Sequence, residues 1–254
     1  MNLGIIGCGA IGTDVAKAAD AMNDIKTIYL YDIDEQASQK LCTQLKKAEI
    51  KPVDEFLHDV DVVFETASQQ AVETYAPLVL QAGKDLIIMS IGSLFNDDLR
   101  KNLETIARKN KCKIHLPSGA VCGIDGIFAA HMESLDKVTL VTTKSPTSLG
   151  KSYDKRTVVF DGNARDAVKQ FPKNINVAAC LSLAGVGFDK TMVQIVADPV
   201  ETRISHKILA HGKFGRLRAE MENMPNPNNP KSSYMASLSA IAILHRIINP
   251  IQIG

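Results

Sequence analysis

The 254-residue sequence lacks tryptophan, has only five cysteines and contains no long apolar run. The cysteines are scattered, odd in number and never spaced as CxxC, which disfavours a disulfide framework and a structural zinc site. Small side chains near a core are expected at all five positions. The longest apolar runs, LIIMSIG and AIAIL, are too short to cross a bilayer. We therefore expect neither a bound metal nor a membrane-spanning segment.

An excess of one charge sign is also missing. The sequence has 29 Lys and Arg and 28 Asp and Glu, which gives a formal net charge of +1 at pH 7. Such a balanced chain has no strong field that would attract nucleic acid or an anionic membrane surface. The first residues include a polar Asn2 and lack the basic head and long apolar segment of a signal peptide. A cytoplasmic protein without nucleic-acid partners is expected.

What is present in the first half is a regular alternation of short apolar segments with helical patterns. Strands are expected at 3–6, 27–31, 59–67, 85–90 and 111–117, and helices at 10–22, 34–45, 69–83 and 96–110. This spacing predicts an α/β fold with a doubly wound parallel sheet, a Rossmann domain, covered by helices on both faces. We expect it to occupy residues 1–118.

The pattern changes in the second half, where a smaller α+β domain is expected over residues 119–230. Segments 137–143 and 156–160 are predicted to be antiparallel strands, and three further strands are expected at 191–199, 203–209 and 214–222. Helical patterns cover 163–172 and 174–185. Together these segments predict a sheet with helices on one side.

The last residues are expected to complete the first domain. Residues 224–233 (MPNPNNPKSS) are rich in Pro and Asn and predict a loop, and 234–248 form an apolar helical pattern. A lone apolar helix needs a core to cover it, so the segment 231–254 is expected to pack back on the first domain.

Three glycines, Gly7, Gly9 and Gly12, form a GxGxxG motif. The motif alone is weak, but here it follows a strand and opens a helix, and Asp32 ends the next strand. Gly7 permits a tight turn, Gly9 lets the backbone approach a pyrophosphate, and Gly12 allows close packing of helix on strand. The combination predicts a dinucleotide site.

The type of dinucleotide is indicated by Asp32, which can accept hydrogen bonds from a ribose diol and would repel a 2′-phosphate. NAD is therefore favoured, although a nearby Lys or Arg would admit NADP. The amides of Ala10 and Ile11, at the start of the helix, are expected to face the anion. Loops after later strands, at 66–70, 90–94 and 117–126, should line the pocket, with cofactor contacts at Ala67 and Ser68.

Four blocks of the chain closely resemble the L-aspartate dehydrogenases of archaea and bacteria, and the resemblance runs over essentially the full length. They are FPKNINVAA (171–179), VADPVETRISH (196–206), PSGAVCGIDG (117–126) and NPKSSYMASLSAIA (229–242). The resemblance implies a homodimer and a reversible NAD- or NADP-linked oxidation of L-aspartate to iminoaspartate. The imine would be hydrolysed to oxaloacetate and ammonia or passed on to NAD biosynthesis.

The resemblance also implies site residues. The family's catalytic histidine corresponds to His206, whose ordinary pKa of about 6.5 suits a general acid and base. Cofactor contacts correspond to Ala120 and Asn176. One departure is Ile204, where family members usually have Asn.

Cationic or amide-rich groups must hold the two carboxylates of aspartate. We expect Lys173 and Ser205 among the substrate contacts, with Arg203 a weaker candidate.

Two alternatives remain open at this stage. The first is a related two-domain dehydrogenase or reductase of another small acid. A dihydrodipicolinate-reductase-like enzyme usually carries a His-His loop, which is missing here, and a homoserine-dehydrogenase-like enzyme usually has a longer chain and a catalytic lysine. The second is a dinucleotide-binding sensor without catalysis, an idea that Ile204 motivates.

Overall fold

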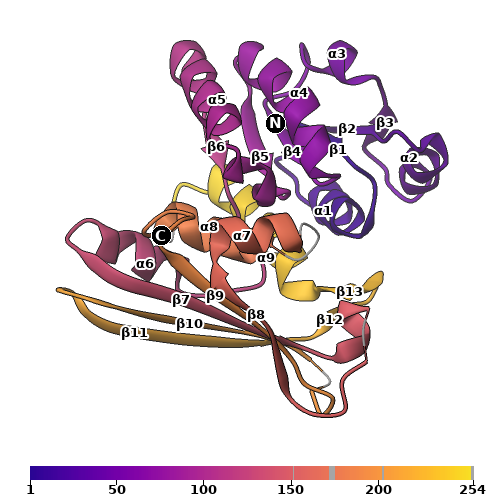
Figure 1. Ribbon diagram of the computed structural model, residues 1–254. Coiled ribbons are helices and arrows are strands. Elements are labelled where there is room, and N and C mark those ends of the chain that lie inside the picture. Colours follow the sequence, from indigo (N-terminus) through magenta and orange to yellow (C-terminus); the bar gives the residue numbers. More distant parts are fainter. Residues whose placement is uncertain (151, 172–174, 202, 253–254) are drawn as a thin grey trace. The chain divides into compact units, whose positions relative to one another are not determined.

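The computed structural model describes residues 1–150, 152–171, 175–201 and 203–252, which fold into two compact units (Figure 1). The first unit comprises Met1–Pro117 and the segment that begins at Ser237, and the second comprises Ser118–Ala236. Within the described ranges, no helix combines the length and the apolar character that crossing a membrane would require.

The first unit is built on a six-stranded sheet in which every pairing is parallel, with the order β3-β2-β1-β4-β5-β6. The strands are β1 Asn2–Ile6, β2 Thr27–Tyr31, β3 Ala48–Ile50, β4 Val62–Glu65, β5 Asp85–Ile88 and β6 Ile114–His115. The helices are α1 Ala10–Asp20, α2 Glu35–Cys42, α3 Val53–Phe56, α4 Gln69–Gln81, the 3₁₀ helix η1 Ile91–Phe95, α5 Asp97–Asn110 and α9 Tyr234–Ile248. The expected doubly wound domain is confirmed.

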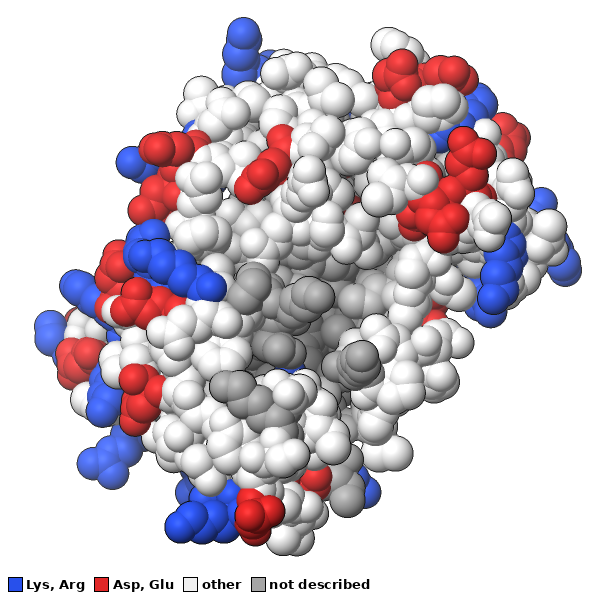
Figure 2. All heavy atoms as spheres, turned by 45° about the vertical axis from the view of Figure 1, so that its right-hand side comes forward, with Lys and Arg blue, Asp and Glu red and all other residues white. Residues whose placement is uncertain are grey.

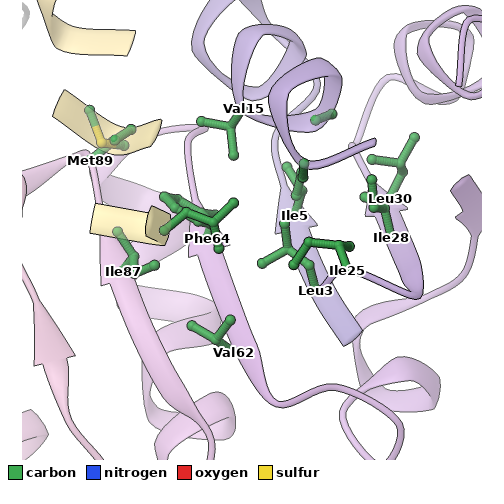
Figure 3. Packing of buried hydrophobic residues seen from close by; sticks show 14 of the residues in the cluster. Leu3, Ile5, Val15, Ile25, Ile28, Leu30, Val62, Phe64, Ile87 and Met89 are labelled. Atoms are coloured by element: carbon green, nitrogen blue, oxygen red, sulfur yellow. The ribbon is translucent and has the colours of Figure 1, made fainter. Parts of the chain in front are cut away.

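The core of this unit explains why the C-terminal helix belongs to it. Side chains of β1, β2, β4 and β5 pack with α1 and α9 in one buried cluster, part of which Figure 3 shows. From α9 the cluster includes Ala240 and Leu244, both fully buried. The strands bury their other face too, since Val63 and Leu86 are equally inaccessible. The expectation that the last helix packs on the first domain is confirmed.

The second unit is built on a five-stranded mixed sheet with the order β11-β10-β7-β9-β8. Its strands are β7 Leu135–Lys144, β8 Thr157–Asn163, β9 Thr191–Ala197, β10 Ile204–Gly212 and β11 Gly215–Asn223, and a separate pair is formed by β12 Pro225–Asn226 and β13 Asn229–Ser233. Its helices are α6 Ile124–His131, the 3₁₀ helix η2 Pro146–Leu149, α7 Ala164–Gln170 and α8 Asn176–Ala184. Helices α7 and α8 contact the sheet, and α6 packs against α8.

The pairing in this sheet adds one fact that the sequence did not supply. The strands predicted at 137–143 and 156–160 run antiparallel, as expected, but they are not neighbours, because β9 lies between them, parallel to β7 and antiparallel to β8. The hydrophobic pattern of a strand records which face is buried, but it does not record which strand lies alongside.

Several short elements were also missed. Residues 124–131 form α6, although 117–126 was expected to be a loop. The helix has only about two turns, and Gly123 and Gly126 weaken its helical pattern in the sequence. The 224–233 segment was expected to be a loop, but it contains the β12–β13 pair. Residues 90–94 were also expected to be a loop, and most of them lie in η1.

Charged side chains are mixed on the surface. On the face shown in Figure 2, Lys and Arg alternate with Asp and Glu, and neither sign forms a broad field. This arrangement agrees with the formal net charge of +1 and offers no extended anion-binding surface on that face.

Candidate functional site

The glycine loop joins β1 to α1, and the fold itself requires two of its glycines. Gly7 has φ +102°, and a Cβ there would lie 2.7 Å from the backbone nitrogen of Ala67. A Cβ on Gly12 would lie 2.0 Å from the carbonyl oxygen of Gly7. Both contacts are far closer than atoms can approach, so the loop could not keep this course with side chains at either position.

Gly9 differs from these two because no contact within the described chain requires a glycine at this position. Its φ of −70° is open to any residue, and no atom lies within 4 Å of the position that a Cβ would take. It precedes Ala10 and Ile11, the first residues of α1, and provides no side-chain cap for their amides. The start of α1 therefore presents backbone N–H groups beside open space, which suits an anion.

Asp32 holds the same loop from the end of β2. Its Oδ2 accepts a hydrogen bond from the Cys8 N–H at 2.6 Å, and its Oδ1 accepts one from the Asp34 N–H at 2.9 Å. A pocket of about 240 Å³ lies beside it, lined by Gly7, Asp32, Ala67 and Ser68 and by Tyr75 of α4, among others. Four of the predicted cofactor residues of the first unit thus line one hollow, whereas Gly9, Ala10, Ile11 and Gly12 are not among its lining residues.

Glu65 was missed by the sequence reasoning, although it ends β4 within a predicted strand. Its buried carboxylate accepts hydrogen bonds from the N–H groups of Ala67 and Ser68 at 2.9 Å each, and from both the N–H and the hydroxyl of Ser90. Burial raises the pKa of Glu65 even though these donors oppose the change. One acid therefore ties together the loops that follow β4 and β5.

In the second unit, His206 is a buried residue of β10 and lies directly opposite Thr142 of β7. Its Nδ1 is 2.9 Å from Thr142 Oγ1. Burial, together with the positive charge of Lys144, lowers the pKa of His206 to about 3. The ordinary value assumed from the sequence is therefore wrong for this environment, and the imidazole is neutral at neutral pH.

Lys144 is a second residue that the sequence reasoning missed. It is the last residue of β7 and only 6% exposed, and burial lowers its pKa to about 8. The signal was present in the alternation along β7, where Val138 and Leu140 are followed on the same face by Thr142 and Lys144. An apolar face that turns polar at its end, yet stays buried, indicates a functional cluster.

Asn223 connects Ala120 to this cluster. It pairs with Ile204 across β10 and β11, and its Nδ2 donates to the carbonyl oxygen of Ala120 at 3.1 Å. Its Oδ1 accepts a hydrogen bond from Ser233. Asn223 was not singled out from the sequence. Asn223 places a buried amide directly across from Ile204, the position at which family members usually have Asn.

The remaining predicted residues have mixed placements. Asn176 is exposed and begins α8. Ser205 lies on the opposite face of the sheet from His206, because neighbouring residues in a strand alternate, so this placement argues against substrate contact beside the histidine. Arg203 is half exposed and pairs with Glu222 at 3.3 Å. Lys173 lies outside the described residues.

No group of three or more His, Cys, Asp and Glu side chains in the described part of the chain is arranged to hold a metal ion.

Comparison with known proteins identifies the family. An L-aspartate dehydrogenase from Methanosarcina barkeri is 43% identical over all of this chain and 99% of its own length. The chain belongs to the L-aspartate dehydrogenase family. Another such enzyme, from Methanothermobacter thermautotrophicus, is 41% identical over all of this chain and 98% of its own. The solved aspartate dehydrogenase from Thermotoga maritima is 28% identical, with a TM-score of 0.83 and coverage of 100% and 99%.

The family models separate the two halves of the chain. A model described as the homoserine dehydrogenase NAD binding domain matches residues 7–117, and one described as the C-terminal part of aspartate dehydrogenase matches residues 125–247. A dihydrodipicolinate reductase from Paenisporosarcina, 12% identical with a TM-score of 0.55, is similar in fold alone. The second half of this aspartate dehydrogenase family member thus carries what is specific to the family.

The contrast between Gly9 and Gly12 gives a direct test of the loop. We expect Gly9→Ala to weaken NADH binding about tenfold or more, because its Cβ would occupy the space of the anion, and to cost less than about 1 kcal/mol of stability. Gly12→Ala should instead destabilise the unit by about 1–3 kcal/mol or more through its clash with the backbone. NADH fluorescence titration and thermal unfolding measure the two effects. Unchanged NADH affinity in Gly9→Ala would contradict the expectation that the start of α1 binds the anionic part of the cofactor.

Proposed function

We infer that this protein is an L-aspartate dehydrogenase, which oxidises L-aspartate to iminoaspartate and then to oxaloacetate and ammonia, and which runs in reverse under suitable conditions. The full-length relationship at 43% identity carries this inference. The buried His206–Thr142 pair and Lys144, in the half of the chain that the aspartate dehydrogenase model matches, supply the polar site that such chemistry needs.

We propose NAD as the preferred cofactor. The residues of the first unit fit a dinucleotide, since Gly9 leaves open space at the start of α1 and Asp32 borders the neighbouring pocket. When bound, NAD would supply the hydride acceptor for oxidation at the Cα of aspartate. Asp32 would receive the ribose hydroxyls and disfavour a 2′-phosphate by charge repulsion.

We further propose that His206 is the general base and acid. Its imidazole is neutral at neutral pH, which is the form that accepts a proton. With Nδ1 held by Thr142, Nε2 is the nitrogen that would meet the reacting groups. In the hydrolytic step, water adds to the carbon of the protonated imine and gives one proton to Nε2. The imidazolium then returns that proton to the nitrogen, which leaves as ammonia, and the added hydroxyl releases its own proton to water as the carbonyl of oxaloacetate forms.

The role of Asp32 predicts a cofactor preference. The wild-type chain should bind NADH more tightly than NADPH, and Asp32→Ser should narrow the difference by about tenfold, chiefly through tighter NADPH binding, because it removes a charge beside the 2′-phosphate. Titration of both nucleotides measures this effect. Wild-type protein that binds NADPH as tightly as NADH would contradict the proposal.

The role of His206 predicts a large kinetic effect. NADH consumption with oxaloacetate and ammonia should fall about 10²–10⁴-fold in His206→Ala, the usual contribution of a general acid or base. The affinity for NADH should change far less, since the glycine loop and Asp32, which are expected to hold most of the nucleotide, lie in the first unit. Retention of activity within a factor of a few would exclude His206 from this role.

The same assay separates the alternatives. NADH consumption that does not need ammonia would indicate a dehydrogenase of a 2-hydroxy acid. NADH binding without turnover of any amino or hydroxy acid would indicate a sensor that has lost catalysis. Ammonia-dependent consumption that His206→Ala abolishes would support both the reaction and the residue.

A further inference from the structure

Asn223 ends β11 and is almost fully buried, with 2% exposure. It is paired with Ile204 of β10, and the preceding pair on the same face joins His206 to Met221. Alternate residues of a strand share a face, and residues directly opposite each other on paired strands lie on the same side of the sheet. Asn223 therefore lies one pair beyond His206, on the face that carries the histidine.

The amide of Asn223 is hydrogen-bonded through both of its polar atoms. Its Nδ2 donates to the carbonyl oxygen of Ala120 at 3.1 Å and to that of Ile204 at 3.3 Å. Its Oδ1 accepts a hydrogen bond from the hydroxyl of Ser233. Ala120 and Ser233 are themselves buried, with 6% exposure each. One side chain thus joins a loop, a strand of the sheet and the residue that precedes α9.

The loop and the residue before α9 are the segments through which the chain enters and leaves the second unit. The chain passes from the first unit to the second between residues 117 and 118, and it passes back between residues 236 and 237. Ala120 lies just after the first of these crossings, and Ser233 lies just before the second. Asn223 therefore holds both segments at one buried point of the second unit.

The backbone beside Asn223 adds a further tie to the same place. The N–H of Tyr234, the first residue of α9, donates to the carbonyl oxygen of Met224 at 3.0 Å. A shift of either segment would leave buried donors or acceptors without their partners, which costs more than the loss of a solvated hydrogen bond. The start of α9 and the loop at Ala120 are thus fixed relative to the end of the His206 face.

We propose that Asn223 is a positioning residue for the reaction, which acts by fixing these two segments. This inference rests on the proposed function, in which the first unit holds the nucleotide and the second holds His206. Hydride transfer needs the reacting atoms about 3–3.5 Å apart, and a misplacement of about 1 Å can cost 10²-fold in rate. Because both hydrogens of Nδ2 are used within the protein, Asn223 acts through the segments and not by touching substrate.

The test compares Asn223→Ala with Asn163→Ala. Asn163 is a matched control because it belongs to the same unit but lies on β8, where its side chain caps α7 by accepting the Asp166 N–H at 2.8 Å. We expect Asn223→Ala to lower kcat for L-aspartate, counted per NADH-binding site, by about 10–100-fold. Asn163→Ala should lower the Tm, as loss of a cap does, and keep the wild-type kcat per site.

Counting kcat per NADH-binding site separates positioning from stability, because unfolded molecules do not enter the count. Wild-type kcat per site in Asn223→Ala, within a factor of a few, would overturn the inference. An equal fall in Asn163→Ala would also overturn it, since general destabilisation of the unit would then explain both.

Ser233→Ala provides a second and milder variant, because it removes only the hydrogen bond to Oδ1. It should lower kcat per site severalfold, and the double variant with Asn223→Ala should be no slower than Asn223→Ala alone, since both changes break the same network. If Asn223→Ala fails to fold, an unchanged kcat in Ser233→Ala would overturn the inference. Reductions that multiply in the double variant would do so too.

The failure of the proposed function gives a different result. Wild-type protein that does not turn over L-aspartate would overturn that function, and the role of Asn223 with it. Active wild-type protein with an unaffected Asn223→Ala variant would overturn only the inference about Asn223.

Discussion

The dinucleotide site depends on two carboxylates at the ends of β2 and β4, the two parallel strands that flank β1. Asp32 accepts the Cys8 N–H, and Glu65 accepts donors from the loops that follow β4 and β5. Because the strands are parallel, their carboxyl ends meet at one edge of the sheet, where loop amides would otherwise lack partners. Each acid therefore fixes the course of a loop, and Asp32 also borders the pocket of the first unit.

The second unit follows a different physical logic. A sheet face that buries Val138 and Leu140 stabilises the unit, whereas burying Thr142, Lys144 and His206 at its end costs hydration. The Thr142 hydroxyl satisfies one histidine nitrogen, and the low pKa keeps the ring neutral. Burying such a cluster lowers the stability of the unit, and buried polar groups of this kind are common at functional sites.

The parts of this account that were predictable from the sequence are those with local signals. The spacing of Gly7, Gly9, Gly12 and Asp32 predicted a dinucleotide site, and the strand–helix alternation predicted the parallel sheet. Lys144 was not predictable in the same way. Its place on the same sheet face as His206 requires β7 and β10 to pair across 60 intervening residues or more. The pKa of His206 was missed for the same reason, because burial follows from tertiary packing rather than from its neighbours in the chain.

In the reductive direction, an L-aspartate dehydrogenase joins ammonia to oxaloacetate through a new carbon–nitrogen bond. Oxaloacetate, ¹⁵N-labelled ammonium and NADH would be incubated with the protein, and the products followed by ¹⁵N NMR against NADH consumption. L-[¹⁵N]aspartate should form in an amount equal to the NADH oxidised. NADH oxidised with malate as the product, and no label in an amino acid, would contradict the proposed activity.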